Sequence, residues 1–381
     1  MIMKQALVVG GSNGIGLALT MQLLNDDYNV IVADRSEPEI KNEKVSYIQV
    51  NLLNDDLSFL DNCKNIDTLI ITAGFGRVTK FETIIDAEIS NSFQVNTVSV
   101  IKILRFYYTK LQSSENFRCA VMCSIAGLVS SPLFALYSST KAALCNFIES
   151  LNIELEIFGS NNRILNVSPG SIKGTKFNGG QNNIEETLPL AKEILLNMDA
   201  KNTIFIPLYN EVFKSVIEQY QTSPHEYGVH SYNYKMESGR FNDKPQLKLG
   251  YLSGTFDLFH IGHLNLLRRA KQCCDYLVVG IHKDGLHKGK ETFIPFEERM
   301  DIVKNIKYVD EVIMSEREDC DVYFKGIVKY DYLFVGSDYK GTERFNRYEE
   351  LFADKGVKIV YFPYTQRTSS TQLREVLNKN R

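Results

Sequence analysis

The sequence lacks any long apolar run. No stretch of about 18 apolar residues, the length that spans a bilayer, occurs anywhere among the 381 residues. The chain opens with MIMKQALVVGG, in which a short apolar run leads straight into glycines. That pattern is typical of a first strand and not of a secretion signal. We therefore expect a cytoplasmic protein with no membrane partner.

The sequence also lacks an excess of charge of one sign. It has 43 Lys and Arg against 46 Asp and Glu, for a net charge of −3. Domains that bind nucleic acid usually carry a basic excess, so the balance argues against a nucleic-acid partner. A local basic pocket for a phosphate group remains compatible with it.

Metal-ligand patterns and internal repeats are missing as well. The seven Cys residues show no spacing to one another or to His that is typical of a metal site. We expect reduced, mostly buried thiols, as in cytosolic enzymes, and no metal held by protein ligands alone. No repeat or low-complexity segment interrupts the chain.

What is present is an alternation of short apolar runs and amphipathic stretches. The apolar runs predict buried parallel strands at Ala6–Val9, Val30–Ala33, Thr68–Ile71, Cys119–Cys123 and Ile164–Val167. Helical patterns lie between them, as at Ile15–Leu24 and Phe81–Leu111. This βαβ alternation predicts an α/β fold, with a Rossmann-type, doubly wound parallel sheet.

A polar and aromatic stretch over residues 223–246 interrupts the alternation, with Gly239 and Pro245 as breakers. We place the domain boundary there, which gives a first domain over 1–240 and a second over 247–381. In the second domain the pattern restarts, so we expect a smaller α/β domain with its own sheet. Its expected elements are strands at Leu247–Leu252, Tyr276–Ile281, Tyr332–Val335 and Val357–Tyr361, and a helix at Leu264–Cys273.

A glycine-rich turn, Gly10 to Gly16, follows the first strand and opens a helix. Glycines there let the backbone approach a pyrophosphate, and the helix N-terminus supplies N–H donors. Asp34 ends the second strand, where a carboxylate accepts hydrogen bonds from the adenosine ribose of NAD. Arg35 follows it and suits the 2′-phosphate of NADP. The sequence leaves the choice between NAD and NADP open.

Tyr137 and Lys141 are four residues apart and share one face of a helix. A nearby ammonium group favours the phenolate, so we expect a lowered pKa for Tyr137, which makes it an acid for protonating a carbonyl oxygen. Ser124 lies thirteen residues earlier, at the end of a predicted central strand.

Residues 1–240 resemble the short-chain dehydrogenase/reductase family. The glycine turn, Thr72-Ala73-Gly74, Asn96, the Ser124–Tyr137–Lys141 set and Ser168-Pro169-Gly170 occur in the family's order. The resemblance implies that Ser124 binds the substrate oxygen, Tyr137 exchanges its proton, Lys141 tunes Tyr137 and holds the nicotinamide ribose, and Asn96 completes a proton relay through water. It implies that the cofactor contacts are Gly10, Ser12, Asn13, Gly14, Ile15, Gly16, Asp34, Arg35, Asn51, Ala73, Gly74, Tyr137, Lys141, Pro169, Gly170 and Thr175. Val9, Ile71, Thr72 and Asn51 depart from the family's usual residues, and none of them is a catalytic group.

The second domain carries the motif Gly254 to His263 directly after a strand. His260 and His263 flank Gly262 in an H-x-G-H spacing, and we expect a helix that starts at His263 and faces phosphates. Zinc is the rival interpretation of two His residues, and the absence of further ligands at a suitable spacing disfavours it. A second hydroxyl-rich run, Arg367 to Arg374, suits a triphosphate at a helix start.

Residues 247–381 resemble the glycerol-3-phosphate cytidylyltransferase family, which joins a phosphorylated alcohol to CMP from CTP. Besides the two motifs, Tyr308 to Val312 and Gly336 to Tyr339 match. The resemblance implies catalytic roles for His260, His263 and Lys290, and Mg²⁺ bridging the phosphates, with Asp257 as a candidate helper. It implies nucleotide contacts from Gly254, Thr255, Phe256, His260, His263, Lys288, Arg299, Asp338, Ser369, Ser370 and Thr371. The wider superfamily also contains adenylyltransferases.

Together the two domains predict consecutive chemistry. A ketose phosphate would be reduced with NAD(P)H to an alditol phosphate, which CTP would convert to a CDP-alditol of the kind that feeds cell-surface polysaccharides. Glycerol, five-carbon and six-carbon alditols are all open, and the acceptor residues are expected within 176–234. One alternative is that the cytidylyltransferase acts first; another is that the first domain only binds NAD(P) as a sensor or an oligomerisation module. Both families usually pair subunits, which implies a homo-oligomer, a dimer or a tetramer.

Overall fold

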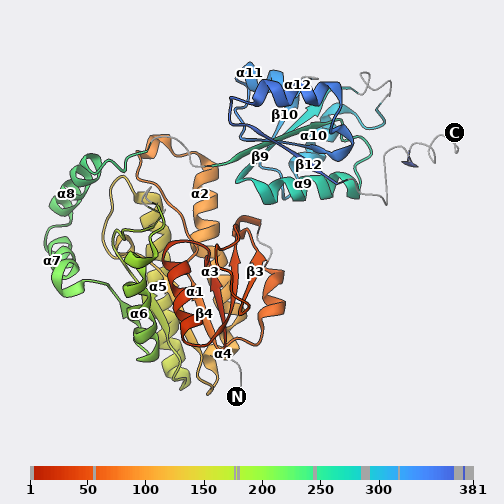
Figure 1. Cartoon of the computed structure of the whole chain (residues 1–381). Helices are drawn as coiled ribbons and strands as arrows, with labels where there is room; N and C mark the ends of the chain where they lie inside the picture. Colours follow the sequence, from red (N-terminus) through yellow and green to blue (C-terminus); the bar gives the residue numbers. More distant parts are fainter. Residues whose placement is uncertain are drawn as a thin grey trace. The chain divides into compact units, whose positions relative to one another are not determined.

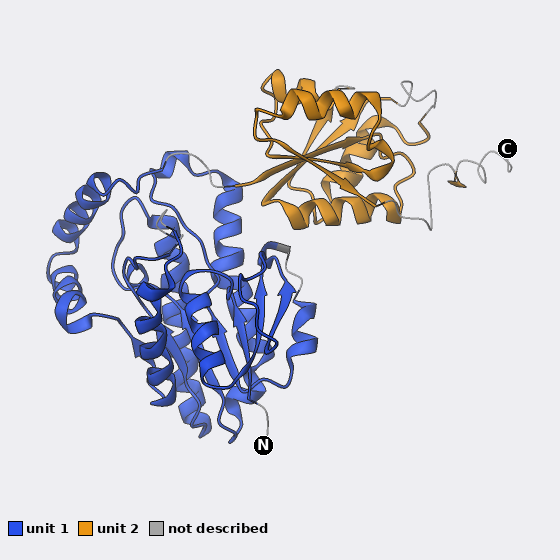
Figure 2. Cartoon of the chain, viewed as in Figure 1, with its two compact units in different colours: residues 1–245 blue, residues 246–381 orange. Residues whose placement is uncertain are grey.

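The computed structural model describes residues 4–54, 57–175, 177, 181–242, 247–284, 292–315, 318–363 and 372–373. The chain folds into two compact units, residues 1–245 and residues 246–381 (Figure 2). Each unit is built around one parallel sheet of its own.

The first unit contains a seven-stranded sheet in the order β3-β2-β1-β4-β5-β6-β7, and all its strand pairs are parallel (Figure 1). The order reverses direction between β1 and β4, which is where doubly wound sheets bind ligands. The predicted fold class is confirmed. The strands are β1 (Gln5–Val9), β2 (Asn29–Asp34), β3 (Val45–Gln49), β4 (Thr68–Ile71), β5 (Arg118–Met122), β6 (Ile164–Val167) and β7 (Ile204–Phe205).

The first sheet is buried on both faces, which explains why its central strands are apolar throughout. Within β1, Leu7 and Val9 belong to one hydrophobic cluster, while Ala6 and Val8 belong to the other. Helices α3, α4 and α5 supply the first cluster, and α1 and α6 supply the second. The helices of the unit are α1 (Gly14–Asn25), α2 (Asp86–Phe93), α3 (Ser99–Phe106), α4 (Tyr108–Gln112), α5 (Ala135–Phe158), α6 (Ile184–Asp199), α7 (Lys214–Thr222) and α8 (Pro224–Glu237).

The stretch 81–111, expected to be helical throughout, is broken into segments. A 3₁₀ turn at Phe81–Thr83 precedes α2, and a π-helical turn at Gln94–Val98 separates α2 from α3. Such π turns widen a helix by one residue and often occur at functional sites. The π-helical turn contains Asn96, and the Asn96 side chain forms two hydrogen bonds with the backbone of Phe75.

The second unit contains a five-stranded parallel sheet in the order β10-β9-β8-β11-β12. Clusters around Tyr251 and around Leu252 bury its two faces. The strands are β8 (Leu249–Gly254), β9 (Tyr276–His282), β10 (Glu311–Ser315), β11 (Tyr332–Gly336) and β12 (Lys358–Phe362). The helices are α9 (Ile261–Cys273), α10 (Phe296–Lys304), α11 (Asp319–Phe324) and α12 (Glu343–Phe352).

Two further features of the fold concern the lengths of its helices and the state of its Cys residues. In the described parts of the chain, no helix is long and apolar enough to span a membrane. All seven Cys residues are unpaired thiols, and all except Cys273 are buried.

Candidate active sites

The glycine turn packs closely against neighbouring backbone and leaves no room for side chains at Gly10 and Gly16. Gly10 has φ +89°, and a Cβ atom added to it would lie 2.5 Å from the Ala73 nitrogen. A Cβ atom on Gly16 would lie 2.1 Å from the Gly10 carbonyl oxygen. Real Cβ atoms do not approach so closely, so these positions need glycine. The turn therefore sits directly against the segment that follows β4, and its role in binding a dinucleotide stays a prediction.

Asp34 lies beside the glycine turn and hydrogen-bonds with its backbone. Its carboxylate accepts hydrogen bonds from the Ser12 nitrogen at 3.0 Å and the Arg35 nitrogen at 2.6 Å. Arg35 is exposed beside it. Asn51 lies beyond the end of β3, where its Oδ1 accepts from the Leu53 nitrogen at 3.1 Å. Both the carboxylate for a ribose and the guanidinium for a 2′-phosphate are thus present, and the choice between NAD and NADP stays open.

Two residues from the segment after β6 reach the same turn. A Cβ atom on Gly14 would lie 3.3 Å from Thr175 Cγ2, so Thr175 packs against the glycine turn. Asn182 Oδ1 accepts from the Gly14 nitrogen at 3.2 Å, and its Nδ2 donates to Asn13 Oδ1 at 2.9 Å. The Gly14 N–H therefore donates to a side-chain oxygen, and a pyrophosphate oxygen is also an acceptor for such a donor. Sequence reasoning missed Asn182 because no motif marks it.

Ser124, Tyr137 and Lys141 come together at the carboxyl end of β5. Ser124 caps the short 3₁₀ turn Ile125–Gly127 and hydrogen-bonds with the Tyr137 side chain. Lys141 Nζ lies 5.7 Å from the Tyr137 ring centroid and donates to the Met122 carbonyl at 2.7 Å. All three are buried. The arrangement presents two hydroxyls and an ammonium group to one point, as protonation of a carbonyl oxygen requires.

The expected lowering of the Tyr137 pKa is wrong for this structure. Burial raises the pKa of the Tyr137 phenol, and the hydrogen bond with Ser124 offsets only part of that rise. Burial also lowers the pKa of Lys141. Desolvation penalises both charged forms more than the helical spacing favours them. A protonated phenol is nevertheless the form that donates a proton to a carbonyl oxygen.

Asn96 joins this cluster through the π-helical turn. Its Oδ1 accepts from the Phe75 nitrogen at 2.9 Å, and its Nδ2 donates to the Phe75 carbonyl at 2.8 Å. A Cβ atom on Gly74 would lie 3.2 Å from Asn96 Oδ1 and 3.3 Å from Lys141 Nζ. The side chains of Asn96, the predicted relay residue, and Lys141 therefore both lie against Gly74.

The opposite side of the cluster is formed by the segment after β6 and by aromatic rings. The Pro169 carbonyl accepts from Ser124 Oγ at 3.4 Å, and a Cβ atom on Gly170 would meet the Phe213 ring at 2.3 Å. Phe134 stacks on Tyr137 with centroids 4.3 Å apart, and Phe177 tilts against it at 5.3 Å. These contacts enclose the Tyr137 ring and explain its burial.

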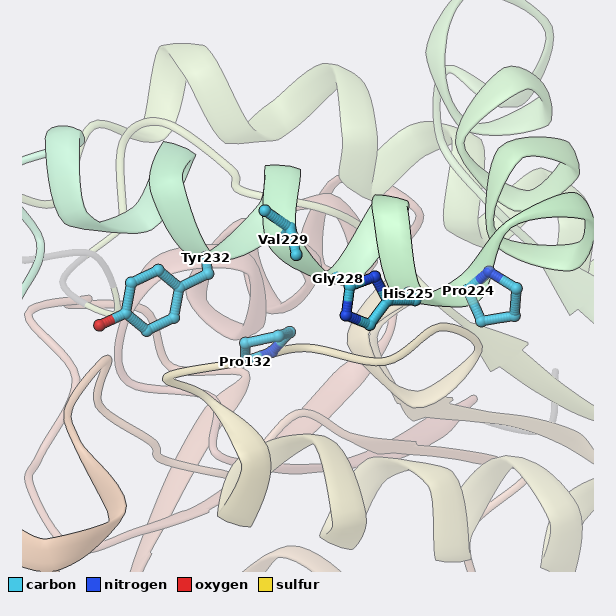
Figure 3. A pocket seen from close by; sticks show the side chains of 6 residues that line it. All are labelled: Pro132, Pro224, His225, Gly228, Val229 and Tyr232. Atoms are coloured by element: carbon cyan, nitrogen blue, oxygen red, sulfur yellow. The ribbon is translucent and has the colours of Figure 1, made fainter.

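A cavity of about 350 Å³ lies between α8 and the loop that follows Ser124. Figure 3 shows Pro132 of that loop facing one side of α8. The lining residues are Pro132, Pro224, His225, Gly228, Val229 and Tyr232. Helix α8 thus covers the loop next to the catalytic cluster, and none of the residues that line the cavity is a predicted catalytic residue.

In the second unit, His260 and His263 form a reciprocal cap at the start of α9. His260 Nδ1 accepts from the Gly262 nitrogen at 3.0 Å, and His263 Nδ1 accepts from the His260 nitrogen at 3.4 Å. Their rings stack with centroids 4.0 Å apart. A neutral ring that accepts at Nδ1 carries its proton on Nε2, and burial lowers the pKa of His260, which favours the neutral form. Two Nε2–H donors at a helix N-terminus suit phosphate oxygens.

The turn before these histidines is strained. Phe256 and Leu258 have φ of 51° and 50°, a left-handed conformation that residues other than glycine seldom adopt. Asp257 between them is buried, and its carboxylate accepts from the Phe293 and Ile294 nitrogens at 3.0 to 3.1 Å. Asp257 therefore anchors the turn to a neighbouring loop, and its suggested role as a helper for Mg²⁺ stays a prediction.

Arg299 is fully buried, and its guanidinium group donates hydrogen bonds to backbone carbonyls. It donates to the carbonyls of Ile294, Thr255, His282 and Lys283, at 2.5 to 3.0 Å. Since these donors hold the carboxyl ends of β8 and β9 together, Arg299 acts as a positioning residue for the Thr255 segment. Asp338 is exposed in the 3₁₀ turn after β11. The predicted residues Lys288, Lys290, Ser369, Ser370 and Thr371 lie outside the described residues.

Replacing Arg299 with Met should destabilise the second unit by about 3 kcal/mol or more, because each buried carbonyl left without a donor costs roughly 1–3 kcal/mol. Urea unfolding followed by circular dichroism measures this change. The matched control is Arg268→Met, since Arg268 is exposed and bonds Asn265 on its own helix. Equal stability of the two variants would refute the positioning role.

A buried polar network near the same strand ends was not predicted. Ser253 Oγ donates to the Asp319 carboxylate and lies 3.3 Å from His282 Nε2. Tyr330 Oη donates to the Asp319 carbonyl at 3.0 Å. Strands β8 and β9, the segment before β11 and helix α11 meet here, so the network ties them together. Among the residues that the structure describes, no group of three or more His, Cys, Asp or Glu residues could hold a metal ion.

The two units match different family models. Residues 4–186 match the short chain dehydrogenase family, and residues 251–376 match the cytidylyltransferase-like family. A glycerol-3-phosphate cytidylyltransferase of Bacillus subtilis is 39% identical over 127 residues, which cover 32% of this chain and 91% of that protein.

The first unit has more distant relatives. An uncharacterized oxidoreductase of Saccharomyces cerevisiae is 28% identical over 184 residues, which cover 45% of this chain and 56% of that protein. A short chain dehydrogenase from Burkholderia cenocepacia, solved in complex with NADP, matches with a TM-score of 0.52 and 18% identity, covering 60% of this chain and 97% of its own. That similarity supports the fold of the first unit.

Proposed function

We propose that this chain, which belongs to the cytidylyltransferase family through its second unit and carries a short chain dehydrogenase domain in its first, turns a ketose phosphate into a CDP-alditol. The chain is a bifunctional enzyme, an NAD(P)-dependent oxidoreductase and a nucleotidyltransferase. The observation that supports the proposal most is the coexistence of the Ser124–Tyr137–Lys141 cluster and the His260–His263 pair in one chain.

The first step is the reduction of a ketone. NAD(P)H supplies a hydride to the carbonyl carbon when it is bound on the glycine turn. Ser124 holds the carbonyl oxygen, and Tyr137 gives its proton to that oxygen as the hydride arrives. Lys141 lies close to the Tyr137 ring, and Asn96 beside it would complete a proton relay through water. The buried, protonated Tyr137 suits the direction of reduction.

The second step is in-line transfer of CMP. An oxygen of the alditol phosphate attacks the α-phosphorus of CTP, the bond to the β-phosphate breaks, and pyrophosphate leaves. Such transfers depend on positioning and charge stabilisation and need no covalent enzyme intermediate. The Nε2–H donors of His260 and His263 would bind the α- and β-phosphate oxygens as charge develops there. Mg²⁺ would bind together with the phosphates of CTP. The described residues contain no group of three or more His, Cys, Asp or Glu residues that could hold it.

The test uses purified protein, NADPH or NADH, and a panel of ketose phosphates, with cofactor oxidation followed by absorbance. CTP and Mg²⁺ are then added, and products are identified by mass spectrometry. Oxidation without CTP, followed by a CDP-linked product, supports reduction before activation. Oxidation that appears only after CTP is added would support the reverse order. CTP use with alditol phosphates, without NAD(P)H oxidation in the presence of any ketone, would support a first unit that only binds NAD(P) as a sensor.

We also propose that copies of the chain assemble into a homo-oligomer in the cytoplasm. Ile153, Ile157 and Phe158 project from α5 with 55%, 82% and 62% of their surface exposed. Three such apolar side chains on one helix favour contact with another protein surface. Light scattering should give at least twice the monomer mass, and Ile157→Asp should lower it. A monomeric wild-type protein would contradict this proposal.

A further inference from the structure

Two basic side chains lie together where the first unit ends. Lys235 is in the last turn of α8, and Arg240 follows the helix. Ser238 Oγ donates to the Lys235 carbonyl at 2.8 Å and lies 3.3 Å from Arg240 Nε, which donates to it. Lys235 is two helical turns beyond Gly228, so it lies on the side of α8 that meets the Ser130–Pro132 loop. Ser238 thus connects the backbone of Lys235 to the guanidinium group of Arg240, and the charge of Arg240 acts on Lys235.

This place is tied to the catalytic cluster from two directions. Arg240 Nη1 donates to Ser171 Oγ at 3.3 Å, and Ser171 is two residues after Pro169, whose carbonyl accepts from Ser124. On the other side, Phe241 pairs with Val78. Val78 is two residues after Gly76, on which a Cβ atom would lie 2.5 Å from the Tyr137 ring.

Neither cation has an acidic partner within the part of the chain that the structure describes. Lys235 is 8% exposed, and its Nζ donates to Ser231 Oγ at 2.7 Å. By contrast, the buried Arg77 is paired with a carboxylate, that of Glu88, at 2.7 Å. Burial lowers the pKa of Lys235 to about 8, with the charge of Arg240 adding to the effect. Holding a charge here without a counter-ion is costly, and an anionic ligand would offset that cost.

We propose that Lys235 and Arg240, together with the hydroxyls of Ser171, Ser231 and Ser238, bind the phosphate group of the substrate of the reductase. This inference rests on the proposed function and names the residues that select a phosphorylated ketone. A phosphate monoester carries up to two negative charges and accepts several hydrogen bonds, which matches two cations and their neighbouring hydroxyls. Binding there positions the carbonyl end of the substrate towards Ser124 and Tyr137.

The 2′-phosphate of NADP is a different anion and would bind elsewhere. Its expected partner, Arg35, follows β2, whereas Ser171 follows β6, and three strands (β1, β4 and β5) separate β2 from β6 in the sheet. A substrate phosphate near Ser171 therefore does not compete with the adenosine end of the cofactor.

The experiment compares a ketose phosphate with the free ketose of the same carbon chain, such as ribulose 5-phosphate with ribulose and dihydroxyacetone phosphate with dihydroxyacetone. Steady-state rates are measured at saturating NADPH. Arg240→Gln should raise KM for the phosphorylated substrate about 10- to 100-fold, the effect of losing one charged hydrogen-bonding group. The kcat/KM for the free ketose should stay within about twofold, because that substrate has no phosphate for Arg240 to bind.

Lys235→Met is the second variant and should also raise KM for the phosphorylated substrate. Arg240→Lys should restore part of the preference for the phosphorylated substrate over the free ketose. The control is Arg105→Gln, which removes an exposed cation from α3. NADPH affinity should be unchanged throughout. If wild-type protein reduces ketose phosphates and both charge-removing variants keep its preference for the phosphorylated form, the subsite is refuted and the proposed function stands. If wild-type protein reduces no ketose phosphate, the proposed function fails, and the subsite fails with it.

Discussion

Replacing Tyr137 with Phe should reduce the turnover number of the reductase about 100- to 10,000-fold, the usual contribution of a positioned general acid. The change removes one oxygen atom from a ring that stays packed on Phe134, with centroids 4.3 Å apart. Ser124 would keep its hydroxyl but lose the partner that delivers the proton. NADPH oxidation with a ketose phosphate measures the effect.

The conservative nature of this variant makes the result interpretable. NADPH affinity and the thermal unfolding of the protein should remain close to wild type, because the ring still fills its buried site. CMP transfer to a preformed alditol phosphate should be unaffected, since the His260–His263 pair lies in the other unit. Ser139→Ala, on the same helix but exposed, is the matched control. A turnover number within tenfold of wild type would exclude Tyr137 as the proton donor.

Sequence predicted the central strands well because each is buried on both faces. Runs such as Ala6–Val9 and Thr68–Ile71 are apolar at every or nearly every position, a pattern that only double-sided burial explains. The strands that were missed lie at sheet edges. In β3, for example, none of the residues of Val45–Gln49 is fully buried, and β7 has two residues. An edge strand packs less, so its sequence carries less of the apolar signal.

Tyr137 and Lys141 were predicted from their spacing on one helix, and Ser124 and Asn96 from motifs that resemble a known family. Contacts between distant segments carry no such signal. Asn182 meets Gly14 across 168 positions, and Arg240 meets Ser171 across 69. The direction of the Tyr137 pKa also depends on burial, which helical spacing does not reveal. Motifs thus indicate which side chains share a site, while the tertiary fold determines their environment and their additional neighbours.

Replacing His260 with Asn should lower the turnover number for CMP transfer about 100- to 1,000-fold, the typical cost of removing one preorganised donor to a transition state. His260 has two separable roles in this structure. Its Nδ1 accepts from the Gly262 nitrogen and caps α9, while its Nε2–H is the expected donor to a phosphate oxygen. Asn is among the best residues at a helix N-cap, so its carboxamide oxygen should keep the cap and lose the donor.

The two roles therefore predict different responses in one variant. If the cap is retained, urea unfolding of the second unit should match that of Gln272→Ala, an exposed control on the same helix. Activity measured as pyrophosphate release from CTP and an alditol phosphate should nevertheless fall, while NADPH-dependent reduction continues in the same molecule. Loss of stability and activity together in His260→Asn would mean that His260 serves mainly as a cap. Full stability with full activity would instead assign the phosphate contact to His263, whose ring lies beside it with centroids 4.0 Å apart.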